Sequence, residues 1–127
     1  MRYFISGHRD LTIKEFEEHY VPQINKVLVS DSHAHFKIGD WEGCDNLAFN
    51  YILKRINRNQ LITIYCVDQV RFPKYSEPYP NITSYKYKTY DECDASMTHD
   101  SDFDIAWIRK GREDSHTAKN IKRRYNL

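Results

Sequence analysis

The pattern that decides the fold lies in residues 101–124, SDFDIAWIRKGREDSHTAKNIKRR. A short apolar run at residues 103–108 predicts a strand, a charged loop surrounds Gly111, and the segment from Asp114 onward is typical of a helix. A strand that passes into a helix through a polar, glycine-containing loop places unpaired backbone N–H groups and small hydroxyls at one spot. Such a spot suits a phosphate group or another anion.

The same design occurs twice more, earlier in the chain. Residues 2–5 predict a strand that runs into the polar segment 6–10, and residues 36–38 predict one that runs into 39–45; a helical pattern follows each. The four glycines of the chain all lie in these three loops: Gly7, Gly39, Gly43 and Gly111. Glycine permits positive φ and a close approach of backbone to ligand. The sequence therefore predicts one site at which the three loops converge.

Two of the predicted helices carry clear local signals. Thr12 and Glu15 form an N-cap pair of the S/T-x-x-E type, which starts a helix after the first loop. Pro22 lies inside the apolar pattern that follows, and we expect it to kink or interrupt that helix. Residues 90–99 are also typical of a helix, which precedes the C-terminal strand.

The clearest strand is at residues 61–67, LITIYCV. It is rich in β-branched and aromatic residues without polar alternation, which predicts a strand that is buried on both faces and lies at or next to the centre of the sheet. Beyond it, the prolines and interleaved tyrosines of residues 68–89 predict a long loop over the site, with a brief strand at 84–87.

Strands and helices alternate along the chain, which implies a parallel sheet with helices on both faces. The predicted fold is therefore a small Rossmann-like α/β domain of three layers. The 127 residues are enough for one hydrophobic core and too few for two, so residues 1–127 form a single predicted domain. Ligands of such sheets bind beyond the carboxyl ends of the strands, where the glycine loops lie.

The overall charge excludes some classes of partner. With 19 basic and 18 acidic side chains, the formal net charge is +1, which does not indicate bulk binding to nucleic acid or to an anionic membrane. No apolar run approaches the roughly 18 residues that span a bilayer, so we expect no membrane partner. A local exception to the charge balance is the basic cluster of Lys119, Lys122, Arg123 and Arg124, which is more typical of a solvated helix end.

Cysteines and histidines do not indicate a metal site. The three cysteines, Cys44, Cys66 and Cys93, lack C-x-x-C spacing and predict neither a disulfide framework nor a zinc knuckle, so we expect the reducing cytoplasm. His33 and His35 form an H-x-H pair, but no third ligand lies in register with them. We expect a site with neither metal nor cofactor.

The loop after the first strand is the first candidate for ligand binding. Ser6, Gly7, His8 and Arg9 combine helix N-terminal N–H groups with a guanidinium, a combination that clamps a phosphate or carboxylate. The alternative is a tight turn with a surface charge.

Three further candidates also have structural alternatives. Asp45 can bond ribose hydroxyls or act as a base, or it can complement a helix dipole. Ser115, His116 and Thr117 can surround a phosphate, or Ser115 can simply cap a helix. Trp41 can stack on a base or pack in the core.

Four short motifs carry a resemblance to a known family. They are S-G-H-R-D-L-T after the first strand, G-D-x-x-G-x-D-x-L-A after the second, and S-D-x-x-I-A-W-I with G-x-x-x-S-H-T-x-x-N-I at the end. Together they resemble the SLOG group of Rossmann-like nucleotide-binding domains, which includes LOG-type phosphoribohydrolases and DNA-processing proteins. The tail is also similar to that of nucleoside 2-deoxyribosyltransferases. The resemblance covers nearly the whole chain in order, through motifs that are individually short and degenerate.

The resemblance implies roles for particular residues. The LOG-type signature P-G-G-x-G-T-x-x-E corresponds to residues 114–120, which keep the threonine and lack the glycines. The family's glutamate falls on Asn120, and an aspartate that assists catalysis in the deoxyribosyltransferases falls on Asp114. An amide supplies no carboxylate nucleophile, so a covalent glycosyl-enzyme is not implied. Attack by water needs a carboxylate base, for which Asp40, Asp45 and Asp114 are the candidates.

The leading expectation is a cytoplasmic protein that binds a nucleotide or nucleotide-derived ligand and hydrolyses its N-glycosidic bond. One alternative is a non-catalytic sensor or sequestering protein. Another is a structural subunit with an interface in the tyrosine-rich residues 75–90, and we expect a homo-oligomer in either case. The predicted binding residues are Ser6, Gly7, His8, Arg9, Gly39, Gly43, Gly111, Ser115, His116, Thr117 and Asn120.

Overall fold

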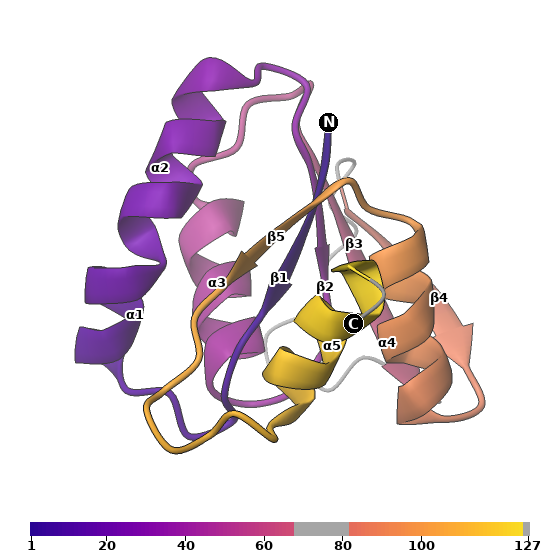
Figure 1. Ribbon diagram of the computed structural model, residues 1–127. Helices are drawn as coiled ribbons and strands as arrows, with labels where there is room; N and C mark the ends of the chain where they lie inside the picture. The colour runs from indigo at the N-terminus through magenta and orange to yellow at the C-terminus, as the bar shows by residue number, and fades with distance from the viewer. Residues whose placement is uncertain (68–81, 126–127) are drawn as a thin grey trace.

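Five parallel strands form the sheet of this protein, with helices on both of its faces (Figure 1). The computed structural model describes residues 1–67 and 82–125, and the elements below are those of this part of the chain. The strands are β1 (Arg2–Ser6), β2 (His35–Ile38), β3 (Leu61–Val67), β4 (Ile82–Tyr87) and β5 (Phe103–Ala106). The helices are α1 (Ile13–His19), α2 (Val21–Ser30), α3 (Cys44–Leu53), α4 (Tyr90–His99) and α5 (His116–Tyr125).

The sheet has the strand order β4-β3-β2-β1-β5, and every neighbouring pair is parallel. The predicted α/β class and parallel sheet are therefore confirmed. β3 lies next to the central strand β2, as its apolar composition predicts. The brief strand expected at 84–87 is β4, which begins two residues earlier, while residues 68–81 of the predicted covering loop lie outside the described residues.

Two local signals of the sequence are also confirmed. Thr12 forms a full capping box with Glu15, in which each side chain accepts a hydrogen bond from the other's backbone N–H. Pro22 marks a break, since α1 ends at His19 and α2 begins at Val21 with the proline in its first turn. Tyr20 joins the two helices and is fully buried. The break lets two short helices follow the curved face of the sheet in place of one long helix.

Side chains of the strands alternate between two cores. Ile5, Phe36 and Ile64 belong to the larger core, which α1, α2 and α3 cover. Phe4 and Tyr65 point to the opposite face and pack with Cys93 and Met97 of α4. The sheet is thus buried on both sides, which explains why its inner strands lack polar alternation.

The connections of β1 and β5 diverge at the carboxyl edge of the sheet. These strands are neighbours, with Tyr3 paired to Phe103. The loop after β1 leads to α1 on one face, whereas the loop after β5 leads to α5 on the other face (Figure 1). Such a divergence between adjacent parallel strands opens a crevice where ligands of α/β sheets usually bind.

Candidate functional site

A pocket of about 190 Å³ lies at the carboxyl ends of β1 and β2, between the loops that follow them and the helices α4 and α5. Eight of the predicted site residues line it: Ser6, Gly7, Arg9, Gly39, Asp45, His116, Thr117 and Asn120. Segments that are up to about a hundred residues apart in the sequence therefore line one pocket. Its lining includes the loop after β1 and the helix α5 after β5, which are the two connections that diverge.

The other six predicted residues lie outside this lining, and four of them have a structural explanation. The ring of His8 is buried, and its Nε2 accepts a hydrogen bond from the Arg109 backbone N–H at 2.9 Å. Ser115 Oγ accepts one from the Ala118 N–H, which is the capping alternative. Gly43 packs against the Arg9 carbonyl, and Gly111 lies in open surroundings. Asp40 is buried and does not line the pocket, although its neighbours Gly39 and Trp41 do, and Asp114 is exposed.

Arg9, Trp41 and Tyr90 form one wall of the pocket. The guanidinium carbon of Arg9 lies 4.5 Å from the centroid of the Trp41 ring. The Trp41 and Tyr90 rings are 4.9 Å apart at an interplanar angle of 44°. A cation over an aromatic face is electrostatically favourable. The wall therefore brings aromatic rings and a positive charge to the pocket.

Ser6 brings a hydroxyl without a protein partner to the pocket. Its side chain is buried, with 6% relative exposure, and Oγ has no hydrogen-bond partner among the described residues. The Ser6 carbonyl is fixed separately, because it accepts a hydrogen bond from the Tyr20 hydroxyl at 2.7 Å. A buried polar group normally has a partner, and an unsatisfied one in a pocket indicates a place for a polar ligand atom.

The first turn of α5 forms the side of the pocket that faces the loops after β1 and β2. His116 and Thr117 open this ten-residue helix, and both line the pocket. Unpaired N–H groups and the helix dipole make such an end attractive to anions. Thr117 is buried, whereas the His116 side chain is 75% exposed. Anion binding by this turn would combine backbone donors with the hydroxyl of Thr117.

Asp45 is held at the start of α3 by two contacts. Its Oδ2 accepts a hydrogen bond from the Trp41 backbone N–H at 3.1 Å. Gly39 lies so close that a Cβ added there would be 2.6 Å from the same oxygen. The helix N-terminus and the N–H donor both stabilise a charged carboxylate. Gly39 thus serves the packing of Asp45 as well as the lining of the pocket.

Asp94 is a second carboxylate in the pocket, and the sequence analysis missed it. Its Oδ2 lies 3.7 Å from Nδ1 of His116. Burial raises the pKa of Asp94, although His116 and Arg123 act in the opposite direction. Tyr90, Asp94 and Met97 all line the pocket from α4. Their spacing of four and three residues in the predicted helix 90–99 is the signal that would have found this face.

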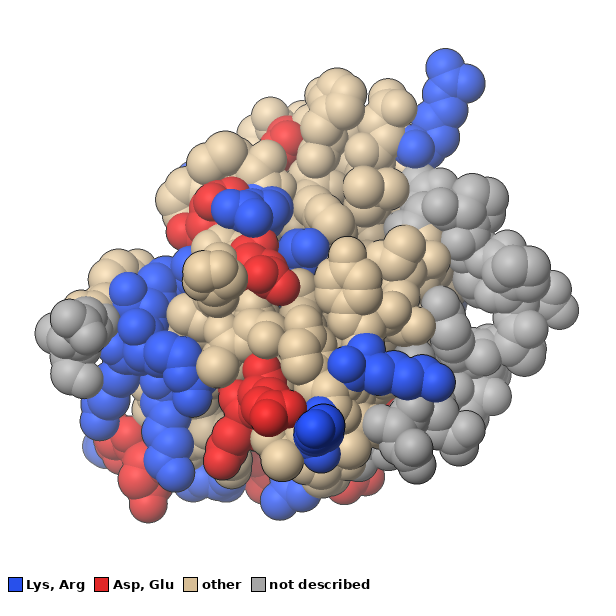
Figure 2. Space-filling model, turned by 90° about the vertical axis from the view of Figure 1, so that its right-hand side faces the viewer, with Lys and Arg blue, Asp and Glu red and all other residues tan. Residues whose placement is uncertain are grey.

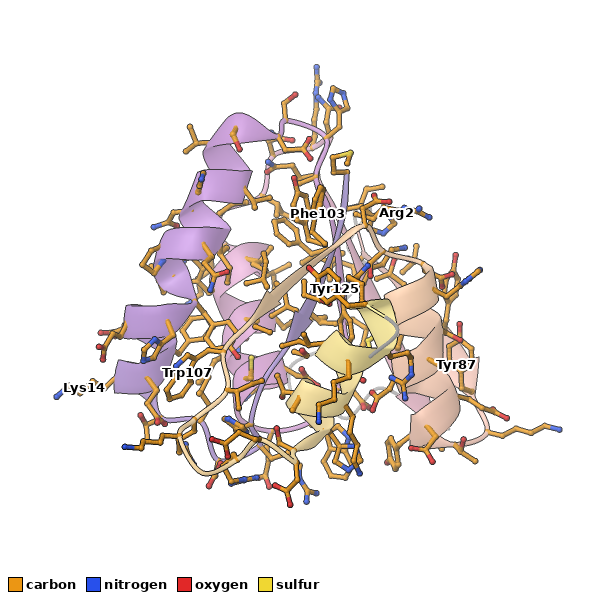
Figure 3. The ribbon with its side chains drawn as sticks, in the orientation of Figure 1. Arg2, Lys14, Tyr87, Phe103, Trp107 and Tyr125 are labelled. Atoms are coloured by element: carbon orange, nitrogen blue, oxygen red, sulfur yellow. The ribbon has the colours of Figure 1, made fainter. Side chains whose placement is uncertain are left out.

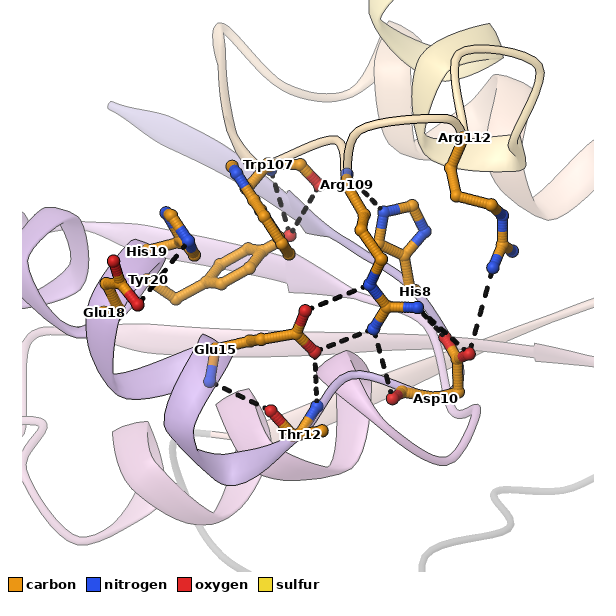
Figure 4. A network of polar contacts seen from close by, with 10 residues as sticks. All are labelled: His8, Asp10, Thr12, Glu15, Glu18, His19, Tyr20, Trp107, Arg109 and Arg112. Carbon is orange, nitrogen blue, oxygen red and sulfur yellow. Dashed lines mark hydrogen bonds and ion pairs between the residues drawn. The ribbon is translucent and has the colours of Figure 1, made fainter.

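The loop that carries Arg9 is fixed on both sides (Figure 4). Arg109, beyond β5, forms ion pairs with Asp10 at 3.1 Å and with Glu15 at 2.7 Å, while its backbone N–H bonds His8. The Arg109 guanidinium, together with the N–H of Thr12, lowers the pKa of Glu15 to about 2. Because His8 and Asp10 are both held, Arg9 between them is directed toward the Trp41 ring.

The same region explains where β5 ends. The apolar run 103–108 predicted a longer strand, but the Trp107 N–H donates to the Tyr20 hydroxyl at 3.0 Å and so leaves the ladder with β1. The Trp107 ring stacks on His19 of α1 with centroids 3.9 Å apart, and it lies beside that helix (Figure 3). This contact joins α1 to the segment that follows β5, where Trp107 packs against the larger core.

The basic cluster at the end of α5 is partly paired within the protein. Arg124 bonds both carboxylate oxygens of Asp104, at 2.7 and 3.0 Å, and Arg123 donates to Asn120 Oδ1 at 2.7 Å. Figure 2 shows Lys and Arg side chains gathered on one side of the face that it presents. Lys119 and Lys122 are exposed, as expected of a solvated helix end.

Histidine and carboxylate groups do not assemble into a metal centre in residues 1–67 and 82–125, where no group of three or more suitable ligands occurs. His33 bonds Ser32, whereas the His35 Nε2 lies 2.6 Å from Thr63 Oγ1. None of the described helices combines the length and apolar character that a membrane span requires. Comparison of the chain with protein-family models, with curated proteins and with solved structures found no match.

Proposed function

We propose that the pocket binds a nucleotide or nucleotide-derived ligand and hydrolyses its N-glycosidic bond. The observation that carries the proposal is the meeting of three different recognition elements in one hollow. They are the aromatic and cationic wall of Arg9, Trp41 and Tyr90, an anion-attracting helix end, and two carboxylates. A nucleotide contains the matching parts: a flat base, a phosphate and a sugar between them.

The base is assigned to the Trp41 and Tyr90 rings. Aromatic side chains bind nucleobases through their faces, and each stacked base contributes about 1–3 kcal/mol. Tyr90 is 37% exposed, so this wall reaches the rim of the pocket. The volume of about 190 Å³ is below the roughly 300 Å³ typical of a drug-sized ligand, which suits a ligand whose base lies at the rim.

The phosphate is assigned to the first turn of α5, with Ser6 and Arg9 across from it. The N–H groups of α5 and the unpartnered Ser6 hydroxyl are donors, and Arg9 supplies a positive charge that no described carboxylate neutralises. In this arrangement the sugar lies near Asp45, whose charged carboxylate can activate water and stabilise an oxocarbenium-like sugar.

Release of the base tests the reaction. We expect chromatography to show free base after incubation of the protein with a panel of nucleoside monophosphates. Arg9→Ala should weaken the binding of phosphorylated ligands about tenfold, and that of free nucleosides much less, because one charge-assisted contact is lost. Arg58→Ala, in an exposed loop outside the pocket, is the matched control. Equal losses for both ligand classes would contradict the phosphate assignment.

A non-catalytic sensor is the second candidate, and Asn120 favours it. This residue lies in the pocket as an amide, buried and bound through Oδ1 to Arg123. It cannot act as a carboxylate nucleophile. Retention of a nucleotide without release of base, seen as a higher melting temperature in the presence of ligand, would support the sensor over the enzyme.

A further inference from the structure

Asp94 faces the pocket from the helix opposite Asp45. It lies on α4 one turn after Tyr90, and its side chain is 21% exposed. The hydroxyl of Ser6, which has no hydrogen-bond partner among the described residues, lines the same pocket. It is an independent indication that a polar ligand atom fits there. Asp94 is therefore placed to touch a bound ligand, and its one ion pair among the described residues is with His116, which lines the same pocket.

The surroundings of Asp94 differ from those of Asp45. His116 and Arg123 of α5 and Asp91 of α4 are the charged or titratable groups that act on Asp94. Burial is the largest influence and raises the pKa of Asp94, so the protonated form is favoured relative to a carboxyl in water. Asp45 instead lies in the first turn of α3 and accepts a hydrogen bond from the Trp41 backbone N–H.

Two carboxyl groups that line one pocket, one beside a histidine and one bonded to a backbone N–H at a helix N-terminus, can divide the work of acid and base. We infer that Asp94, positioned against His116, is the catalytic residue that donates a proton to the leaving base, while Asp45 accepts one from the attacking water. This inference rests on the proposed hydrolysis and assigns a residue that no sequence motif of the chain indicated.

The proposed step is balanced without a further reactant. The oxygen of water forms a bond to the anomeric carbon as the bond from that carbon to the base nitrogen breaks. The electron pair of the broken bond goes to the base, which takes the proton of Asp94. The proton lost by water goes to Asp45. Exchange with solvent then restores a protonated Asp94 and a charged Asp45.

His116 has a positioning role in this scheme. Its Nδ1 lies 3.7 Å from Asp94 Oδ2, and most of its ring is exposed to solvent. After the proton has left Asp94, the His116 ring is the side chain that faces the carboxylate, and its exposed edge connects the pair with bulk water.

The test compares Asp94→Asn with Glu17→Gln, an exposed carboxylate on α1 that does not line the pocket. Substrates are a purine nucleoside monophosphate, whose base leaves as a poor anion, and 4-nitrophenyl riboside 5-phosphate, whose leaving group needs no proton. We expect Asp94→Asn to lower kcat about 100-fold or more on the nucleotide and less than about tenfold on the nitrophenyl compound. The Kd for the nucleotide should change less than about threefold, and Glu17→Gln should match wild type.

Each other outcome is also decisive. Equal losses on the two substrates, or a Kd that rises in parallel with the loss of kcat, would overturn the role of Asp94 as a proton donor. Wild-type turnover by Asp94→Asn would overturn it while leaving the proposed hydrolysis intact. Binding of nucleotide by the wild type without any release of base would sink the hydrolysis itself, and with it this inference. A partial recovery of kcat in Asp94→Glu on the nucleotide would support the assignment.

Discussion

At the scale of one residue, we expect the Ser6 hydroxyl to lower the free energy of unfolding and to raise the affinity for ligand. Its hydroxyl is buried without a partner, which costs folding free energy, yet it lies in the pocket. Ser6→Ala removes the unsatisfied oxygen, so the free energy of unfolding should rise by about 1 kcal/mol. The same variant should bind nucleotide about tenfold more weakly. Urea unfolding and calorimetric titration measure the two effects.

Thr98 supplies the control for this prediction. Its Oγ1 is the other buried side-chain oxygen without a partner in residues 1–67 and 82–125, and it lies outside the pocket lining. Thr98→Val should therefore stabilise the protein to a similar extent and leave binding unchanged. A Ser6→Ala variant that is destabilised, with full affinity, would show that the hydroxyl serves the fold.

Sequence reasoning predicted individual site residues unevenly. Ser6, Arg9 and the first turn of α5 were found because small hydroxyls and basic side chains after a strand follow a known chemical pattern. Asp94 was missed because its role depends on which face α4 presents to the sheet. His8 was chosen for its chemistry, yet a backbone N–H more than a hundred positions later occupies its ring nitrogen. The spacing of residues along the chain gives no information about that contact.

The elements themselves were more predictable than their ends. Apolar composition placed β3 correctly, and the capping box and Pro22 placed the boundaries of α1 and α2. The length of β5 was wrong because Trp107 bonds to the Tyr20 hydroxyl and leaves the sheet. Local propensity decides whether an element forms, whereas contacts between distant elements decide where it stops.

The loops that connect these elements contain two glycines with positive φ, and their surroundings differ. Gly43 has φ of 74°, and a Cβ there would collide with the Arg9 carbonyl, whereas Gly111 has φ of 89° and a Cβ there would meet no atom within 4 Å. Gly111→Ala should cost about 1 kcal/mol from backbone strain alone. Gly43→Ala should cost about 3 kcal/mol, because strain and a shift of the loop after β1 add together.

Chemical unfolding of the two glycine variants, with ligand titration, measures this difference. Since the Gly43 contact fixes the backbone of Arg9, we also expect Gly43→Ala to weaken nucleotide binding and Gly111→Ala to leave it unchanged. The reverse order of stabilities, or a loss of binding in Gly111→Ala, would argue against this account. Gly111 would then act on the ligand in a way that its open surroundings do not explain.

At the scale of the whole molecule, acid should weaken the fold in two steps. Burial lowers the pKa of His35 to about 4 from 6.5, so between these values the unfolded chain binds a proton that the folded protein does not. The ion pair with Arg109 and the Thr12 N–H lower the pKa of Glu15 to about 2 from 4.5, which has the same effect at lower pH. The free energy of unfolding should therefore fall as the pH drops below about 6.5, and again below about 4.5.

Urea unfolding at pH 7.5, 5.5 and 4.5 tests the first step. In His35→Gln the decline between pH 6.5 and 4 should be smaller than in wild type, because one of the protons that drive it is absent. His33→Gln, which removes an exposed imidazole two residues earlier, is the control. A slope in His35→Gln as steep as that of the wild type would assign the acid sensitivity to other groups.

The pairing of β1 with β5 has a consequence for the order of events in folding. Tyr3 finds its partner Phe103 only after a hundred residues have been added, and the pocket also needs the first turn of α5 beyond that strand. Contacts of such long sequence separation form late, since closing a long loop costs entropy before any contact repays it. A nascent chain can thus acquire β1, β2 and β3 on the ribosome without any affinity for ligand. Binding at the pocket should therefore require that β5 and the first turn of α5 have already formed.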